Sequence, residues 1–197
     1  MTETAKVKLF FNFRSPYCYI ASKTIFSLLD DFHAEFDWKP LAGWTGRSAP
    51  DRAKVKIPLV RQDIRRITKK MGIAMNPPPI TTEPTKAGAA SLLAEERGLL
   101  REYVVAMMDK EWAVGQDIGD PEIILTVGQD IGLDKKELLN ALESPNYLAR
   151  MEENWQEAQS LGVFGVPTFV IGEDIFWGSD RIDYVRDHLQ ELGLAKL

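Results

Sequence analysis

The stretch Val-Lys-Leu-Phe-Phe-Asn-Phe-Arg-Ser-Pro-Tyr-Cys, residues 7–18, joins a strand pattern to the start of a helix. Every second residue from 7 to 13 is aliphatic or aromatic, which is the period of a strand with one buried face. Ser15 is a favourable N-cap residue, and Pro16 fits the first helical position. We therefore predict a strand over residues 7–13, followed directly by a helix over residues 16–32.

Further strands are predicted on both sides of the chain's middle. Alternating aromatic residues indicate a strand over residues 35–41, which completes a βαβ unit. Near the C-terminus, short strands over 168–171 and 175–177 flank a Gly-Glu-Asp sequence typical of hairpin turns. A last helix follows, over about residues 178–192.

The segment between these parts is predicted to be helical. One helix runs from Asp51 to Met71, one or two lie within 85–112, and further helices start at Asp120, Asp134 and Ser144. The order is therefore βαβ, a helical block and ββα, which is the arrangement of a thioredoxin-like fold. We predict an α/β fold of this type with a large all-helical insertion. Residues 1–50 and 161–197 would form the thioredoxin-like domain, and residues 51–160 the helical insertion domain.

The composition excludes several classes of function. The 197 residues carry a net charge of −5, which argues against a nucleic-acid partner held by charge. One Cys and two His are too few for an intrachain disulfide or a Cys/His metal site, so no metal is expected. No apolar run is long enough to span a bilayer, and no signal peptide is visible, so we expect no membrane partner and a cytoplasmic location.

The Ser15-Pro16-Tyr17-Cys18 turn has two interpretations. Backbone N–H groups at a helix start favour an anion such as a thiolate, and thioredoxin-like oxidoreductases carry a Cys-x-x-Cys pair at this turn. Here Ser15 takes the first position and only Cys18 remains. Alternatively, Ser15 simply caps the helix and Cys18 packs as a small apolar residue.

Two C-terminal motifs also have alternatives. Val166–Pro167, directly before a strand, is a candidate cis peptide whose backbone could pair with a peptide-like ligand, although a loop proline can also start a strand. In Trp177-Gly178-Ser179-Asp180, Ser179 or Asp180 could cap the last helix. Equally, the N–H groups there could receive a ligand carboxylate, while Asp180 takes an ammonium group.

Taken together, these motifs resemble one family. The strand–Ser-Pro-Tyr–helix unit, the helical insertion, Gly-Val-Phe-Gly-Val-Pro-Thr (residues 162–168) and Trp-Gly-Ser-Asp-Arg (residues 177–181) occur in one order. They are similar to the 2-hydroxychromene-2-carboxylate isomerases and kappa-class glutathione transferases, relatives of DsbA. The resemblance covers the whole chain and is closer to the isomerases. It implies glutathione as cofactor, an aromatic small-molecule substrate, a role in aromatic catabolism and a homodimer.

The resemblance also implies roles for individual residues. Ser15 would face the glutathione thiol, and Val166, before cis Pro167, would pair with the cysteinyl backbone. Ser179 and Asp180 would hold the γ-glutamyl end. Lys56, seven positions before Asp63, would approach the glutathione, with Lys54 as the neighbouring option and a solvated helix face as the alternative.

One departure from the family pattern concerns the loop before the first insertion helix. Relatives place an Asn there, whereas Arg47 or Ser48 would have to substitute for it here. Trp44 and Trp177 could form a wall for an aromatic substrate, although a buried Trp is the alternative.

The implied reaction is glutathione-dependent cis–trans isomerisation of an aromatic acid. A thiolate adds to a conjugated double bond, the resulting single bond rotates, and elimination releases the thiol. The negative charge that develops needs donors or a cation, for which Lys56 is the candidate, with Arg14 and Tyr17 as further options. The competing interpretations are thiol–disulfide exchange, glutathione conjugation, and ligand binding without catalysis.

Overall fold

The core of the protein is a four-stranded mixed sheet. In this computed structural model, which describes residues 4–43 and 48–196, the strand order is β2-β1-β3-β4. The strands are β1 (Ala5–Phe11), β2 (Ala34–Pro40), β3 (Thr168–Ile171) and β4 (Asp174–Trp177). β1 and β2 are parallel, whereas β1–β3 and β3–β4 are antiparallel. The predicted thioredoxin-like fold is therefore confirmed.

β1 lies in the middle of the sheet and is covered on both faces. Val7, Leu9 and Phe11 pack into the larger apolar core. Phe10 points to the opposite face, where it packs with Ala158 of α8 (Pro145–Ser160). The alternation of side chains along a strand thus places apolar residues on both faces.

The N-terminal βαβ unit differs from its predicted form in one respect. The helix predicted over 16–32 is interrupted, because a turn separates α1 (Pro16–Ser22) from α2 (Ser27–Asp31). At this turn the Lys23 N–H bonds to a carbonyl only three residues back, and the Ser27 hydroxyl donates to the Thr24 carbonyl at 2.7 Å. Hydroxyls that bond nearby carbonyls compete with the regular helical ladder.

The insertion between β2 and β3 is helical, as predicted. Its elements are α3 (Pro50–Met71), α4 (Thr85–Glu96), α5 (Leu100–Met108), a π-helical turn η1 (Asp109–Val114), α6 (Pro121–Asp130), α7 (Lys135–Leu142) and α8. The predicted caps are confirmed at three starts, where the side chains of Asp120, Asp134 and Ser144 accept backbone N–H bonds. Gly72 ends α3 in the left-handed conformation.

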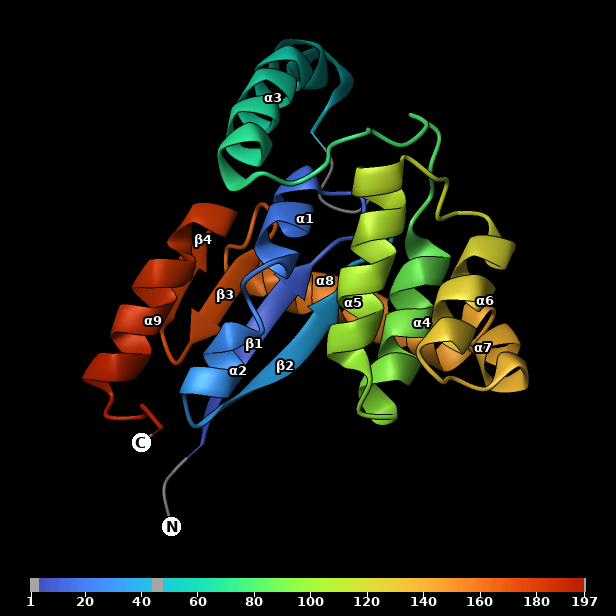
Figure 1. Cartoon of the computed structure of the whole chain (residues 1–197). Helices are drawn as coiled ribbons and strands as arrows, with labels where there is room; N and C mark the ends of the chain where they lie inside the picture. The colour runs from blue at the N-terminus through green and yellow to red at the C-terminus, as the bar shows by residue number, and fades with distance from the viewer. Residues whose placement is uncertain (1–3, 44–47, 197) are drawn as a thin grey trace.

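The insertion shares its core with the sheet, and the indole of Trp38 on β2 donates to the Ser91 hydroxyl on α4 at 2.9 Å. Figure 1 shows α4 to α7 gathered beside the β2 edge, while α3 lies apart at the end of the molecule, above α1. Within the described part of the chain, no helix has the length and apolarity needed to cross a bilayer.

The C-terminal hairpin is followed by the last helix, which starts later than predicted. A short 3₁₀ turn, η2 (Ser179–Arg181), comes first, and α9 then runs from Ile182 to Glu191. Residues 182, 185 and 189 of α9 are buried against the sheet, and η2 lies against α1. The loops before α1, β3 and α9 therefore meet at one end of the sheet.

Candidate functional site

The turn between β1 and α1 is organised by the buried side chain of Asn12. Its amide donates to the carbonyls of Leu41 and Gly43, at 3.2 and 3.3 Å, where the β1–β2 ladder ends. Its side-chain oxygen accepts the Arg14 N–H, and its backbone carbonyl accepts the Ser15 N–H at 3.0 Å. Asn12 therefore fixes the position of Ser15, a role that sequence reasoning missed.

Ser15 joins the two motifs that the sequence singled out. Its hydroxyl oxygen accepts the Cys18 N–H at 3.3 Å, which confirms the predicted N-cap. The same hydroxyl lies 3.4 Å from the Val166 carbonyl, to which it donates. The Val166–Pro167 peptide bond is cis, as predicted. The N–H of Val166 has no hydrogen-bond partner among the described residues, so it remains available to a ligand.

Cys18, in contrast, lies within α1, and its side chain is fully buried in the core. Burial raises the pKa of its thiol to about 12, although hydrogen bonds from Asn12 and Ser15 oppose that shift. A thiol of such high pKa and no exposure carries little thiolate at neutral pH. The interpretation of Cys18 as a packed apolar residue is the one that its environment supports.

The Ser179-Asp180 motif lies next to this turn but does not cap α9. Neither η2 nor α9 has a side-chain capping hydrogen bond, so the predicted capping role of these residues is wrong. Asp180 instead forms an ion pair with the neighbouring Arg181 at 3.0 Å. The pKa of Tyr17 is raised to about 12, mainly by burial and by Asp63, and the charge of Asp180 adds to the shift because it lies near the first turn of α1. The Ser179 hydroxyl has no partner among the described side chains.

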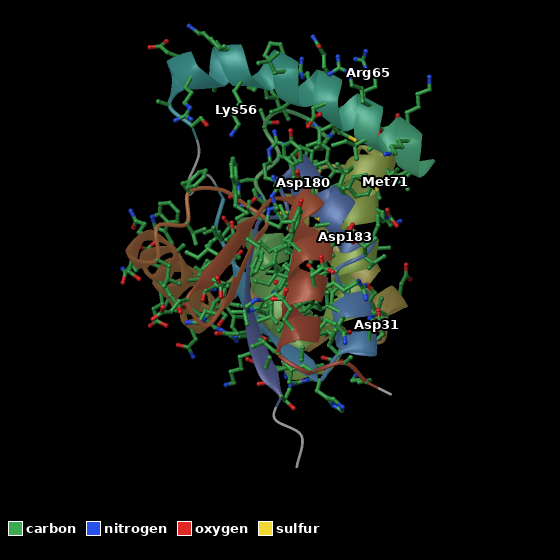
Figure 2. All side chains as sticks on the ribbon, turned by 90° about the vertical axis from the view of Figure 1, so that its left-hand side faces the viewer. Asp31, Lys56, Arg65, Met71, Asp180 and Asp183 are labelled. Carbon is green, nitrogen blue, oxygen red and sulfur yellow. The ribbon has the colours of Figure 1, made fainter. Side chains whose placement is uncertain are left out.

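The helix α3 carries Lys56, which lies apart from the other site residues. Figure 2 shows Lys56 on the side of α3 that faces the rest of the molecule, while Arg65 points away. Asp63, two helical turns on, accepts a 2.8 Å hydrogen bond from the Tyr17 hydroxyl. Positions seven apart share a helix face, so Lys56 also belongs to the face of α3 that is turned toward α1. No described residue bonds to Lys56.

Arg14 and Glu111 form a second feature that sequence reasoning missed. The Arg14 guanidinium donates to the Ile80 carbonyl at 2.9 Å and lies 4.0 Å from a carboxylate oxygen of Glu111. Glu111 is fully buried in η1, and its two carboxylate oxygens have no hydrogen-bond partner among the residues that the structure describes. Burial raises the pKa of Glu111 well above its usual value, while Arg14 opposes the shift. In the sequence Glu111 directly follows Asp109 and Lys110, so no local pattern marks it as buried.

The remaining predicted residues lie in different places. Trp44 and Arg47 fall outside the described residues, and Ser48 has no hydrogen bond with any described side chain. Trp177 is 51% exposed, so it is not a core residue. Its ring packs against that of Phe164 at an interplanar angle of 58°, with 4.4 Å between the centroids, beside the loop that leads to Val166. An exposed aromatic pair therefore borders this loop.

The site residues thus come from three separate parts of the chain. Ser15, Val166 and Pro167 are brought together directly, with Ser179 and Asp180 adjacent through α1. Together they offer a hydroxyl, a backbone N–H and a carboxylate, which are groups that can bind an extended, peptide-like ligand.

Comparisons with known proteins agree with the fold. A model of the DSBA-like thioredoxin domain matches residues 6–190. A 2-hydroxychromene-2-carboxylate isomerase from Sphingobium xenophagum is 26% identical over 96% of this chain and 99% of its own. Glutathione S-transferase kappa 1 from Caenorhabditis elegans is 23% identical over 97% and 93%. A solved 2-hydroxychromene-2-carboxylate isomerase structure superimposes with a TM-score of 0.82 at 22% identity, covering 95% of both chains.

Proposed function

The chain belongs to the family of DSBA-like thioredoxin domains, and from that premise we propose that it is a glutathione-dependent isomerase of the 2-hydroxychromene-2-carboxylate isomerase type. Its reaction would be the cis–trans isomerisation of an aromatic acid. The observation that carries the proposal is the position of Ser15, whose hydroxyl faces the Val166 carbonyl across the cis-proline loop while the lone Cys18 is buried.

The residues around Ser15 suit the binding of a cysteinyl peptide. The Val166 N–H and carbonyl can pair with an extended backbone, as in the addition of a strand to a sheet edge. This would place the cysteinyl side chain next to Ser15. Asp180 would then attract the ammonium group of the γ-glutamyl end, and the Ser179 hydroxyl with the backbone N–H groups of this turn would donate to its carboxylate. Glutathione therefore fits the donors and acceptors that these residues present.

Bound glutathione would supply the thiolate that adds reversibly to a conjugated double bond of the substrate. On binding, the Ser15 hydroxyl would turn from the Val166 carbonyl, to which it donates at 3.4 Å, and donate to that sulfur, which favours its ionised form. Lys56 lies on the face of α3 turned toward this turn and would counter the negative charge that develops on the substrate. Trp177, with Phe164, would offer an aromatic wall to the ring of the substrate.

Thiol–disulfide exchange, the first alternative, is disfavoured by the state of Cys18. That reaction needs an accessible thiolate, and the pKa of this buried thiol is raised to about 12. Glutathione conjugation is the second alternative, favoured by the similarity to a kappa glutathione transferase. It would use the same Ser15 and Val166 groups, so only the fate of the thiol separates it from isomerisation.

The test is a thiol balance during turnover. A hydroxylated aromatic acid with a conjugated side chain is incubated with the protein and glutathione, and both isomers are followed by absorbance while free thiol is titrated. The proposal expects isomers to interconvert only when glutathione is present, with free thiol unchanged. A stoichiometric loss of thiol would indicate conjugation instead, and isomerisation that needs no thiol would contradict the proposal.

A further inference from the structure

The side chain of Arg14 is held in place next to the turn that carries Ser15. Arg14 directly precedes Ser15 in the chain, and its backbone N–H donates to the Asn12 side chain at 2.8 Å. Its guanidinium donates to the Ile80 carbonyl at 2.9 Å and lies 4.0 Å from a carboxylate oxygen of Glu111. Since the side chain is only 19% exposed, solvent ions screen its charge weakly. A fixed cation therefore accompanies the Ser15 turn.

Glu111, which faces this cation, occupies a place that favours its neutral form. It is fully buried, and its carboxylate oxygens accept no hydrogen bond from a described residue. Among the described residues, the charges that act on it are Arg14, which favours ionisation, and Asp117, which opposes it. Lys23 on α1 pairs instead with Asp109 of η1. A single cation at 4.0 Å, beyond direct hydrogen-bond distance, does not offset the desolvation of a buried carboxylate. We therefore expect Glu111 to hold a proton, as the raised pKa also indicates.

A charge at this place reaches the first turn of α1. The turn η1 packs against α1. Burial is the main cause that raises the pKa of the Cys18 thiol, and Glu111, when charged, adds to the shift. Cys18 also donates its backbone N–H to the Ser15 hydroxyl at 3.3 Å. Because charges in a protein interior act through a lower dielectric than water, a sulfur held at this turn would sense whether Glu111 is charged.

We propose that the Arg14 cation favours the thiolate form of the thiol ligand bound at Ser15, and that Glu111 faces this cation as a neutral acid and so does not cancel its charge. The inference rests on the proposed function, because it requires a thiol ligand such as glutathione at that turn. A nearby opposite charge favours the ionised form of a titratable group. The thiol proton passes to solvent, and the sulfur that remains is the nucleophile.

Arg14 suits this role better than Lys56, the other cation considered for the reaction. Lys56 forms no hydrogen bond or ion pair with a described residue, whereas the Arg14 guanidinium is anchored on the Ile80 carbonyl. A charge that is already in place costs no reorganisation when the anion forms. Stability alone does not explain the buried pair, because apolar residues in such places are often as stable. Its position beside Ser15 points instead to the ionisation of the ligand.

The test measures the pKa of the thiol of bound glutathione from the ultraviolet absorbance of its thiolate, with the S-methylglutathione complex as the blank. Cys18 does not interfere near neutral pH, because burial raises its pKa to about 12. Arg14→Gln should raise the pKa of the bound thiol by about 1, a roughly tenfold loss of thiolate. Arg14→Lys should keep much of the native value. Arg97→Gln removes a cation that pairs with Glu137 on α7, and it should change nothing.

Two further measurements separate the charge of Arg14 from a merely structural role. Glu111→Gln, which imitates the neutral acid, should leave the pKa of the bound thiol close to the native value. Arg14→Gln should bind S-methylglutathione, which has no ionisable thiol, as tightly as the native protein in calorimetry. An equal loss of this binding would mean that Arg14 only shapes the site, and it would overturn the inference.

Two other outcomes would contradict the inference while leaving the proposed function in place. The first is an unchanged pKa of the bound thiol in Arg14→Gln. The second is a lower pKa of that thiol in Glu111→Gln, which would show that Glu111 is ionised in the native protein, and this result does not depend on the folding of Arg14→Gln. If the native protein bound neither glutathione nor S-methylglutathione, the proposed function would fail, and the inference with it.

Discussion

The hydroxyl of Tyr17 donates a 2.8 Å hydrogen bond to the Asp63 carboxylate and so joins α1 to α3. Tyr17 directly follows the Ser15-Pro16 pair, and Asp63 shares a helix face with Lys56. This bond therefore couples the position of α3, and of Lys56, to the turn that carries Ser15.

Replacing Tyr17 by Phe removes this link and leaves the ring in place. We expect backbone amides of α3 to exchange with deuterium faster, because local opening of the helix becomes less costly. Global stability should fall by only about 1 kcal/mol, the usual net value of one hydrogen bond. Tyr184→Phe is the matched control, since its hydroxyl bonds to no described residue. Unchanged exchange in α3 would show that the bond does not hold the helix.

The buried Cys18 predicts how stability depends on pH. Its pKa is raised from 9.0 to about 12, so the folded state keeps the thiol proton that the unfolded chain loses. Its contribution to the free energy of unfolding is therefore fully present below about pH 9 and is lost as the pH rises toward 12. Cys18→Ala should flatten this part of the profile in urea denaturation. Equal slopes for both proteins would contradict the assignment.

The burial of Glu111 should make stability depend on pH in a second range, from acidic to neutral pH. Burial raises its pKa well above the usual value, so the folded state favours the protonated form and stability is lost as the pH rises above the unfolded pKa. Glu111→Gln cannot ionise and should gain stability relative to the native protein between acidic and neutral pH. The gain should grow as the pH rises from acidic to neutral, because only the native protein must then take up a proton or bury a charge on folding. Melting temperatures measured across this pH range provide the check.

If Glu111 instead stays ionised beside Arg14, the opposite result follows. Glu111→Gln would then lose stability at neutral pH, because the attraction between the Glu111 carboxylate and the Arg14 guanidinium 4.0 Å away is removed.

Replacing Trp177 should change the affinity for the substrate without a large change in the stability of the fold. It is 51% exposed, so Trp177→Ala should cost little folding free energy while removing the proposed aromatic wall. We expect KM for an aromatic acid to rise about tenfold with a smaller change in kcat. Ile175→Ala on the same strand, with 46% exposure, is the control. Equal effects of both substitutions would remove Trp177 from the substrate site.

Much of the fold could be predicted because local patterns and tertiary structure agree. The alternation around β1, the turn before β4 and the caps Asp120, Asp134 and Ser144 reappear in the structure. The break between α1 and α2 could not be predicted, since it depends on hydroxyl–carbonyl bonds such as that of Ser27, which composition does not reveal. The start of α9 was misjudged because residues that favour caps occur there without capping.

The sequence predicted the site residues that local motifs mark, but not those whose roles depend on partners distant in the sequence. Ser15 and Val166 were found because a helix start and a strand-preceding proline leave sequence signals. Asn12 and Glu111 act through neighbours distant in sequence, such as Gly43 and Arg14, so no local pattern marks them. The role of Lys56 stays a prediction, because no described residue forms a hydrogen bond or an ion pair with it.

The most direct test of the central claim compares Ser15→Ala with Cys18→Ala in glutathione-dependent isomerisation of an aromatic acid. If Ser15 holds the incoming thiolate, Ser15→Ala should lower kcat/KM about a hundredfold, in line with the loss of one hydrogen-bond donor to a reacting anion. Cys18→Ala, with its thiol buried in the core, should keep most of the activity. Full turnover by Ser15→Ala, or its loss in a folded Cys18→Ala protein, would contradict the account.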